Sequence, residues 1–197
     1  MSTSGIGSGG GGRSFGERLL GALKLDATVY EEVEHDPSAF GQAAVVVGLS
    51  SIAQGLGAFH DAGMGGSLAG FVGSFAGWFI GAGLVWLIGV KIMSCTSDYG
   101  ELVRTLGFAA APGMIGVLGL LPLGPALPLL GLAIFVLSTI AAVIAVRQAL
   151  DVGTGRAVVV CILANLVPLA LALVVGLLLA GAGMVAQPSE VPGAMGF

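Results

Sequence analysis

The segment GGSLAGFVGSFAGWFIGAGLVWLIGV, residues 65–90, contains 26 residues and no charged side chain. Uncharged, mostly apolar runs of about 18 residues or more are typical of transmembrane helices. As a helix the segment would be roughly 39 Å long at about 1.5 Å per residue, so it would tilt or extend beyond the hydrocarbon layer. The sequence therefore predicts a membrane-spanning helix here, and we expect the other helices to pack around it.

Glycines in this segment form two adjacent stripes, and they are Gly73, Gly77 and Gly81 in one and Gly66 and Gly70 in the other. Glycine at every fourth position leaves a groove without side chains, where another backbone can approach closely. We expect these residues to pack against another helix, either within the fold or in a partner. The alternative is that glycine is simply common in this chain, which contains 35 glycines in 197 residues.

The composition excludes a soluble fold. The chain is 56% apolar and 9% charged, with a mean hydropathy of +1.02, whereas soluble domains carry about 25% charged residues. The net charge of −4 comes without a basic patch, so a nucleic-acid partner is not indicated. We predict an all-α, polytopic membrane protein whose surroundings are the lipid bilayer.

The sequence divides into four parts. Residues 1–13 are rich in Gly and Ser and are expected to be disordered. Residues 14–35 have apolar side chains at helical spacing and too many charges to span, which predicts one cytoplasmic amphipathic helix. Residues 36–181 form the membrane domain, and residues 182–197 are a flexible, Gly- and Pro-rich tail.

Five membrane spans are predicted, at residues 39–59, 65–90, 102–121, 127–146 and 157–181. All seven Lys and Arg residues then fall before span one, between span two and the entry of span three, where Arg104 lies, or between spans four and five. These positions share one side of the membrane, which the positive-inside rule makes the cytoplasm. We expect a plasma membrane protein with a cytoplasmic N-terminus and an external C-terminus.

Catalytic, cofactor and metal sites are not expected. No Ser-His-Asp set, paired carboxylates or Cys/His cluster can be assembled, and Cys95 and Cys161 make no metal or redox motif. The sequence therefore predicts neither an enzyme nor a bound cofactor or metal.

Two polar side chains inside the spans are candidates for a function, because buried polar groups in membranes often mark one. These are Gln54 and Asn165, the latter three residues before Pro168. Pro168 leaves the carbonyl of Ala164 without its helical donor, so Asn165 could satisfy such a group or bond a neighbouring helix. With Pro112, the same residues could instead line a path for a small solute.

Charged and polar residues of the cytoplasmic loops have two interpretations. The simpler one is anchoring at the membrane interface, and the other is a small docking surface for a cytoplasmic partner. The residues concerned are Lys91, Asp98, Tyr99, Glu101, Arg104, Arg147, Asp151 and Arg156.

Three stretches together resemble the Yip domain family, the Ypt/Rab-interacting membrane proteins, in its prokaryotic branch. They are FGERLLGALKLDATVYEEVEHDPSAFGQAAVVV before and into span one, SDYGELVRTLGFAAAPGMIGVL at span three, and VRQALDVGTGRA after span four. Gly107, Phe108 and Pro112 match in kind the family's Gly-Tyr-Ser…Pro element. The resemblance covers roughly residues 14–181.

The resemblance implies five membrane helices, a cytoplasmic N-terminus and no known catalysis. Eukaryotic members of the family resemble scaffolds that bind small GTPases, and that branch carries an Asp-Leu-Tyr-Gly-Pro motif. This chain has only Asp36-Pro37 there, which argues against a small-GTPase partner. We expect a non-enzymatic scaffold or accessory subunit, with a membrane-protein partner or a homo-oligomer. A small-solute channel or transporter is the alternative.

Overall fold

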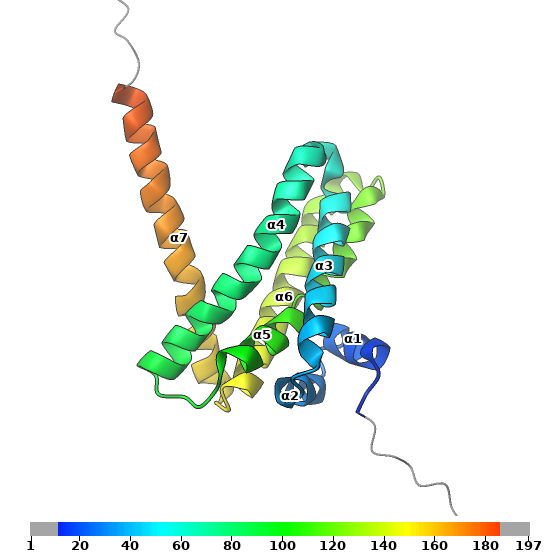
Figure 1. The fold of residues 1–197 in the computed structure, drawn as a ribbon. Helices are drawn as coiled ribbons and strands as arrows, with labels where there is room; N and C mark the ends of the chain where they lie inside the picture. Colours follow the sequence, from blue (N-terminus) through cyan, green and yellow to red (C-terminus); the bar gives the residue numbers. More distant parts are fainter. Residues whose placement is uncertain (1–11, 186–197) are drawn as a thin grey trace, which may run out of the picture.

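The computed structural model describes residues 12–185 of the chain, and all regular structure within them is helical (Figure 1). The elements in order are α1 (Phe15–Leu23), α2 (Ala27–His35), α3 (Ala39–Gly57), α4 (Phe59–Trp86), the π-helical η1 (Leu87–Ile92), α5 (Tyr99–Phe108), the 3₁₀ helices η2 (Ala111–Leu120) and η3 (Gly124–Ala126), α6 (Leu127–Ala149) and α7 (Thr154–Val185). The expected tails at residues 1–13 and 182–197 lie largely outside the described residues.

Five helical segments in this part of the chain are long and apolar enough to cross a membrane, which confirms the predicted all-α fold with five spans. They are Ala39–Gly57, Gly63–Ile92, Tyr99–Leu120, Gly124–Ala149 and Thr154–Leu178. The bounds shift by a few residues from those predicted. The short helices α1 and α2 lie together with the α5 entry and the α6–α7 turn at one end of the bundle (Figure 1), which we call the α2 end.

The N-terminal amphipathic region is two helices rather than the single helix predicted over residues 14–35. Ser14 and Glu17 form a capping box that starts α1. The chain then turns at Leu25, whose φ is 60°, and the Asp26 side chain caps α2 through the Thr28 amide. An N-cap residue in the middle of the segment therefore ends one helix and starts the next.

The closest packing in the bundle joins α3 to η2. The sequence had instead predicted that the helices pack around residues 65–90, which belong to α4 and η1. A Cβ added at Gly57 would overlap the carbonyl oxygen of Gly116, and one added at Gly119 would lie 3.0 Å from the Gly57 Cα. At Gly116 it would lie 3.1 Å from the Gln54 Cα. The backbones of α3 and η2 thus touch where neither has a side chain, so α3 and the third span form the centre of the fold.

The third span changes from α-helix to 3₁₀-helix at Pro112. Pro112 has no amide hydrogen to donate to the carbonyl of Phe108, four residues earlier, and α5 ends at Phe108. The hydroxyl of Ser50 on α3 donates to the carbonyl of Ala110 at this junction, at 2.7 Å. A 3₁₀ helix has about three residues per turn, which places Gly113, Gly116 and Gly119 on one edge, facing α3.

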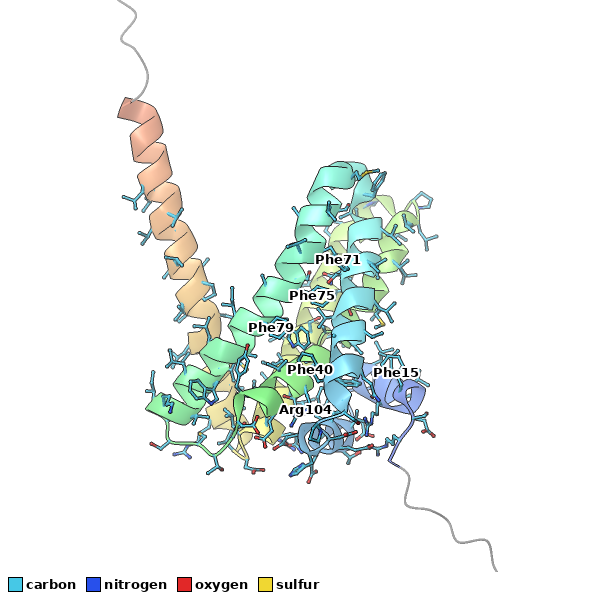
Figure 2. The ribbon with its side chains drawn as sticks, viewed as in Figure 1. Phe15, Phe40, Phe71, Phe75, Phe79 and Arg104 are labelled. Carbon is cyan, nitrogen blue, oxygen red and sulfur yellow. The ribbon has the colours of Figure 1, made fainter. Side chains whose placement is uncertain are left out.

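Helix α4 returns beside α3 after a break at Gly63, where φ is 62°. Its Trp78 stacks on Phe40 of α3, with ring centroids 6.0 Å apart, and the indole Nε1 donates to the Val103 carbonyl of α5 at 2.8 Å. Figure 2 shows Phe75 and Phe79 of α4 in the same row beside Phe40. Aromatic packing and one buried hydrogen bond hold the part of α4 nearest the α2 end against the bundle.

Helix α7 contacts α6, α4 and η1 near its start and then runs away from the other helices (Figure 1). Its buried residues, Ala157, Val160 and Ala164, all lie in the first half. Beyond them, the leucines and valines up to residue 178 are exposed, including Leu177 and Leu178. Such a surface suits contact with lipid chains or with another membrane helix.

The contact between Gly57 and η2 predicts that an alanine at this position destabilises the fold, whereas an alanine at an exposed glycine does not. Gly57→Ala should lower the free energy of unfolding by about 1–3 kcal/mol or prevent folding, because the added methyl group overlaps backbone that cannot rotate away. Gly176→Ala, on the exposed part of α7 with no atom within 4 Å, is the control and should cost nothing. Thermal unfolding in detergent measures both, and equal midpoints for the two variants would contradict the packing described.

Candidate functional site

Two cavities lie side by side along α4. One has a volume of about 340 Å³ between α3, α4 and α5, and its wall includes Ser50, Gln54 and Ser74. The other has about 330 Å³ between α4, α6 and α7, and its wall includes Asn165 and Pro168. Both are also lined by Gly77, Gly81, Leu106 and Ala142. Because these four residues line both cavities, the two cavities are adjacent, and together we call them the lateral groove.

Four of the five glycines in the predicted α4 stripes have no packing partner within the described chain. A Cβ added at Gly70, Gly73, Gly77 or Gly81 would meet no atom within 4 Å. Gly66 lines a separate cavity beside Gly55 and Ser67. The packing within the fold that the sequence allowed for these stripes is therefore not found, and packing against a partner helix stays a prediction.

Four glycines that pack closely at one helix contact were missed by the sequence reasoning. They are Gly57, Gly113, Gly116 and Gly119, between α3 and η2. The sequence feature that could have identified them is that glycines recur every third residue after Pro112. This spacing fits a 3₁₀ helix rather than an α-helix, in which the spacing would be four.

The two intramembrane polar residues line the lateral groove but bond locally. The Gln54 Nε2 donates to the Ser50 carbonyl at 3.3 Å, and the Asn165 Nδ2 donates to the Cys161 carbonyl at 2.7 Å, each four residues back in the same helix. The acceptor of Asn165 is thus Cys161 and not Ala164, the carbonyl that Pro168 leaves without its donor. Both side chains therefore donate to a carbonyl of their own helix, and their polar atoms lie along the lateral groove.

Several residues of the predicted docking loops already serve the fold. Asp98 and Glu101 form the capping box of α5. The Tyr99 hydroxyl donates to the Phe79 carbonyl at 3.0 Å. Lys91 lies over the Trp86 ring, 4.8 Å from its centroid. These contacts favour the anchoring interpretation for this part of the predicted set.

The remaining loop residues divide between the fold and the surface. The Arg147 Nε donates to the neighbouring Gln148 side chain at 3.1 Å, and Arg156 is exposed. Asp151 is exposed in the α6–α7 turn, with φ of 50°. It lines a cavity at the α2 end together with Asp98 and Glu101. The structure therefore brings only the acidic members of the set together.

Arg104 ties the third span to α2. Its guanidinium donates to the carbonyls of Val33 and Glu34, at the end of α2 where helical carbonyls lack partners. A cation at the C-terminus of a helix also opposes the partial negative charge of the helix dipole. Figure 2 shows Arg104 beside α2 at this end of the bundle.

Arg18 ties α1 to α2 and α3. Its side chain is only 6% exposed and pairs with Glu32 at 2.9 Å and Asp36 at 2.7 Å, and it donates to the Gln42 amide oxygen at 3.1 Å. The Ser38 hydroxyl, and after it Arg18, holds the pKa of Asp36 below its ordinary value. Arg18 is therefore buried although it is charged, since its partners on α2 and at the start of α3 surround it.

Glu34 is the most unusual titratable group at the α2 end. It is 5% exposed, and burial is the main cause that raises its pKa to about 7. His35 opposes this increase, while Asp151, Glu101 and Glu31 add to it. Its position at the C-terminus of α2 is also unfavourable for an anion. The ionised Glu34 is therefore a cost to the fold.

The fold and the groove define a class, the polytopic α-helical membrane proteins with a small-residue groove open to the lipid. The model of the Yip1 domain matches residues 26–179, which is most of the chain. The chain belongs to the Yip1 domain family, which is not known as an enzymatic family. The match does not separate the branches of the family, so the prokaryotic branch stays a prediction. No curated protein and no solved structure matched the chain in the same comparisons.

Removing the Arg18 side chain should loosen α1. Arg18→Ala leaves the half-exposed Glu32 and Asp36 without their shared cation, which should cost about 1–3 kcal/mol. Arg13→Ala is a matched control, because Arg13 also pairs with Glu32 but is 38% exposed, and it should cost much less. Tryptic cleavage after Lys24, in the α1–α2 turn, should accelerate only in Arg18→Ala, and equal rates in the two variants would contradict the role given to Arg18.

Replacing Glu34 should stabilise the protein in a pH-dependent way. The folded form binds a proton at Glu34 between pH 4.5, its ordinary pKa, and about 7, whereas the unfolded chain does not. The free energy of unfolding should therefore fall as pH rises through this window, by no more than about 3 kcal/mol. Glu34→Gln should raise the thermal midpoint at pH 8 and lose this advantage towards pH 4.5.

Other charges that face Glu34 also enter this measurement. They are His35 and Glu31 on α2, Glu101 and Arg104 on α5, and Asp151 in the α6–α7 turn. The bond from its ring to the Glu31 carbonyl, and then the Glu34 charge, raises the pKa of His35, so His35→Gln should be titrated in parallel. A Glu34→Gln midpoint below that of the unchanged protein at pH 8 would show that the carboxylate is stabilising instead.

Proposed function

We propose that this Yip1 family protein is a non-enzymatic scaffold or accessory subunit of the membrane, whose lateral groove holds an apolar helix of a partner membrane protein. The observation that supports it best is the open space beside Gly73, Gly77 and Gly81. Helices associate in lipid by close van der Waals packing rather than by escape from water. A helix face stripped of side chains and left uncovered by its own chain suits a second helix.

The setting of this scaffold is a prokaryotic plasma membrane, with the α2 end in the cytoplasm and the C-terminus outside. The placement of all seven Lys and Arg residues before span one or in two of the loops supports this orientation. The same loops would offer the cytoplasmic docking surface. A small-GTPase partner is not part of the proposal.

A small-solute channel or transporter is the second candidate, and one observation favours it. Gln54 and Asn165, from different helices, lie along the same lateral groove, with Ser50 and Ser74 in the Gln54 half. A path of this kind needs polar groups that converge on one line. The groove is otherwise apolar, and Pro112, the other residue named for such a path, is buried between η2 and α3, which makes this the weaker proposal.

The scaffold proposal predicts that Gly77→Leu releases the partner and leaves the fold intact. The added side chain enters open space, so the thermal midpoint in detergent should change little. Native protein purified in mild detergent should carry a stoichiometric membrane protein that Gly77→Leu loses and Gly176→Leu, the control on α7, retains. A photo-crosslinking residue at position 73 should join that protein through one of its membrane helices.

Other outcomes of the same experiment decide between the proposals. Crosslinks between two copies of the chain would replace the partner with a homo-oligomer. Retention of the partner by Gly77→Leu would contradict binding at the groove. A clean monomer would contradict the scaffold proposal altogether, and solute flux in liposomes would then test the channel.

A further inference from the structure

A second cavity of chemical interest, of about 300 Å³, lies at the α2 end and is distinct from the lateral groove. Its wall comes from three places in the chain, and it consists of Glu34 and His35 of α2, Thr96, Ser97, Asp98 and Glu101 around the start of α5, and Asp151 of the α6–α7 turn. We call it the acidic pocket, because four of its seven residues carry carboxyl groups.

Two of these carboxylates are already engaged by the fold. An Asp98 oxygen accepts from the Glu101 amide, and a Glu101 oxygen accepts from the Asp98 amide, both at 2.8 Å. The same Glu101 oxygen accepts from the Ser97 hydroxyl at 3.0 Å. Neutral donors satisfy these groups without cancelling their charge, so the pocket stays negative.

Glu34 is different, because its carboxylate has no donor among the described residues although 95% of the residue's surface is covered, with 5% exposed. The cation that acts on the Glu34 carboxyl is His35 of the same helix, while Arg104 donates to the backbone carbonyls of Val33 and Glu34. Glu34 lines the pocket together with Glu101 and Asp151, whose charges raise the pKa of its carboxyl. No fully covered side-chain oxygen in the described residues lacks a hydrogen-bond partner, so the unpaired Glu34 carboxyl oxygens remain accessible, and a cation can reach them from the pocket.

The chemistry of the pocket favours an organic cation over a bare metal ion. No group of three or more His, Cys, Asp or Glu residues in the described part of the chain is arranged to hold a metal ion. The pocket is also larger than an ion and carries hydroxyl groups at Thr96 and Ser97. A guanidinium has five N–H donors on a planar, weakly hydrated cation, which can serve several carboxylates at once.

We propose that the acidic pocket binds an arginine side chain of a basic protein segment, with Glu34 and Asp151 as the ligands of its guanidinium. Charge complementarity supports this occupant, since the cation would give Glu34 the partner that the chain itself does not provide. The proposal deepens the scaffold function by giving the chemistry of a cytoplasmic partner, and it rests on that function for the existence of such a partner. It does not depend on the lateral groove.

Binding to the pocket is coupled to protons. Glu34 binds a cation only when ionised, so affinity should decline as the pH falls below about 7. His35, whose pKa is also raised, gains a positive charge as the pH falls and acts in the same direction. Glu101 and Asp151 line the site, and Glu31 and Arg104 lie outside it but close to Glu34. A His35→Gln variant separates the two titrations, because it should keep the dependence that Glu34 causes.

The test uses the full-length protein in nanodiscs of zwitterionic lipid and a fluorescent peptide of sequence Arg-Gly-Arg-Gly-Arg, read by anisotropy. Glu34→Gln and Asp151→Asn should each weaken binding about tenfold at pH 8, the loss expected for one charge-assisted contact. Glu31→Gln is the matched control, because Glu31 is exposed on the same helix and outside the pocket. It should leave the affinity within about twofold.

Each other outcome overturns a definite part of the proposal. Equal losses in Glu31→Gln and Glu34→Gln would show attraction to overall charge rather than a site. Binding of the matching citrulline peptide would exclude the guanidinium charge as the determinant, and competition by spermidine at equal concentration would assign the pocket to free polyamines. Gly77→Leu should bind the peptide normally, so failure of the lateral-groove proposal and failure of this one remain distinguishable.

Discussion

The contact between α3 and the 3₁₀ half of the third span is the constraint on which the rest of the bundle depends. Gly57 and Gly116 bring two backbones together where no side chain fits, and this requires a helix whose bare edge repeats every three residues. Pro112 supplies that geometry by ending the α-helical ladder, and Ser50 bonds the Ala110 carbonyl at the junction. Once α3 and the third span are fixed in this way, Trp78 can attach α4 to α5 from the side.

Glycines therefore have two opposite roles in this chain. Those of η2 are covered by α3 and determine the fold, whereas Gly73 and Gly81 of α4 face open space. The difference arises because the aromatic side chains of α4 fill its contacts with the bundle, while Gly77 and Gly81 line the lateral groove instead of a packed interface. Helix α7, which could have covered that face, contacts the bundle near its start and then diverges (Figure 1). The lateral groove lies where the glycines of α4 are left uncovered by α7.

Hydropathy and charge were sufficient to predict the fold class and the five spans, because a bilayer imposes helix length and apolarity on each segment. They could not identify which glycines pack, since the spacing of four in α4 and the spacing of three in η2 both suit close contact. Nor could periodicity foresee that Arg18 is buried, because the turn at Leu25 folds α1 onto α2. The candidate loop residues were chosen from their charge, but Glu34 was not among them, because its burial depends on how α2 packs on α5 and α6.

Glu34 shows why the α2 end differs physically from the rest of the molecule. Arg18 and Arg104 compensate the charges and carbonyls around α2 and so stabilise the attachment of the N-terminal helices. Glu34 is covered by the same attachment, yet it receives no compensating donor from the described chain, and its burial opposes its charge. A fold selected for stability alone would have a neutral side chain there, since charge at that position raises the free energy of the folded state. A charged group that is retained although it destabilises the fold is typical of a binding site rather than of a core. The destabilising charge of Glu34 is therefore the feature of the α2 end that points to a function.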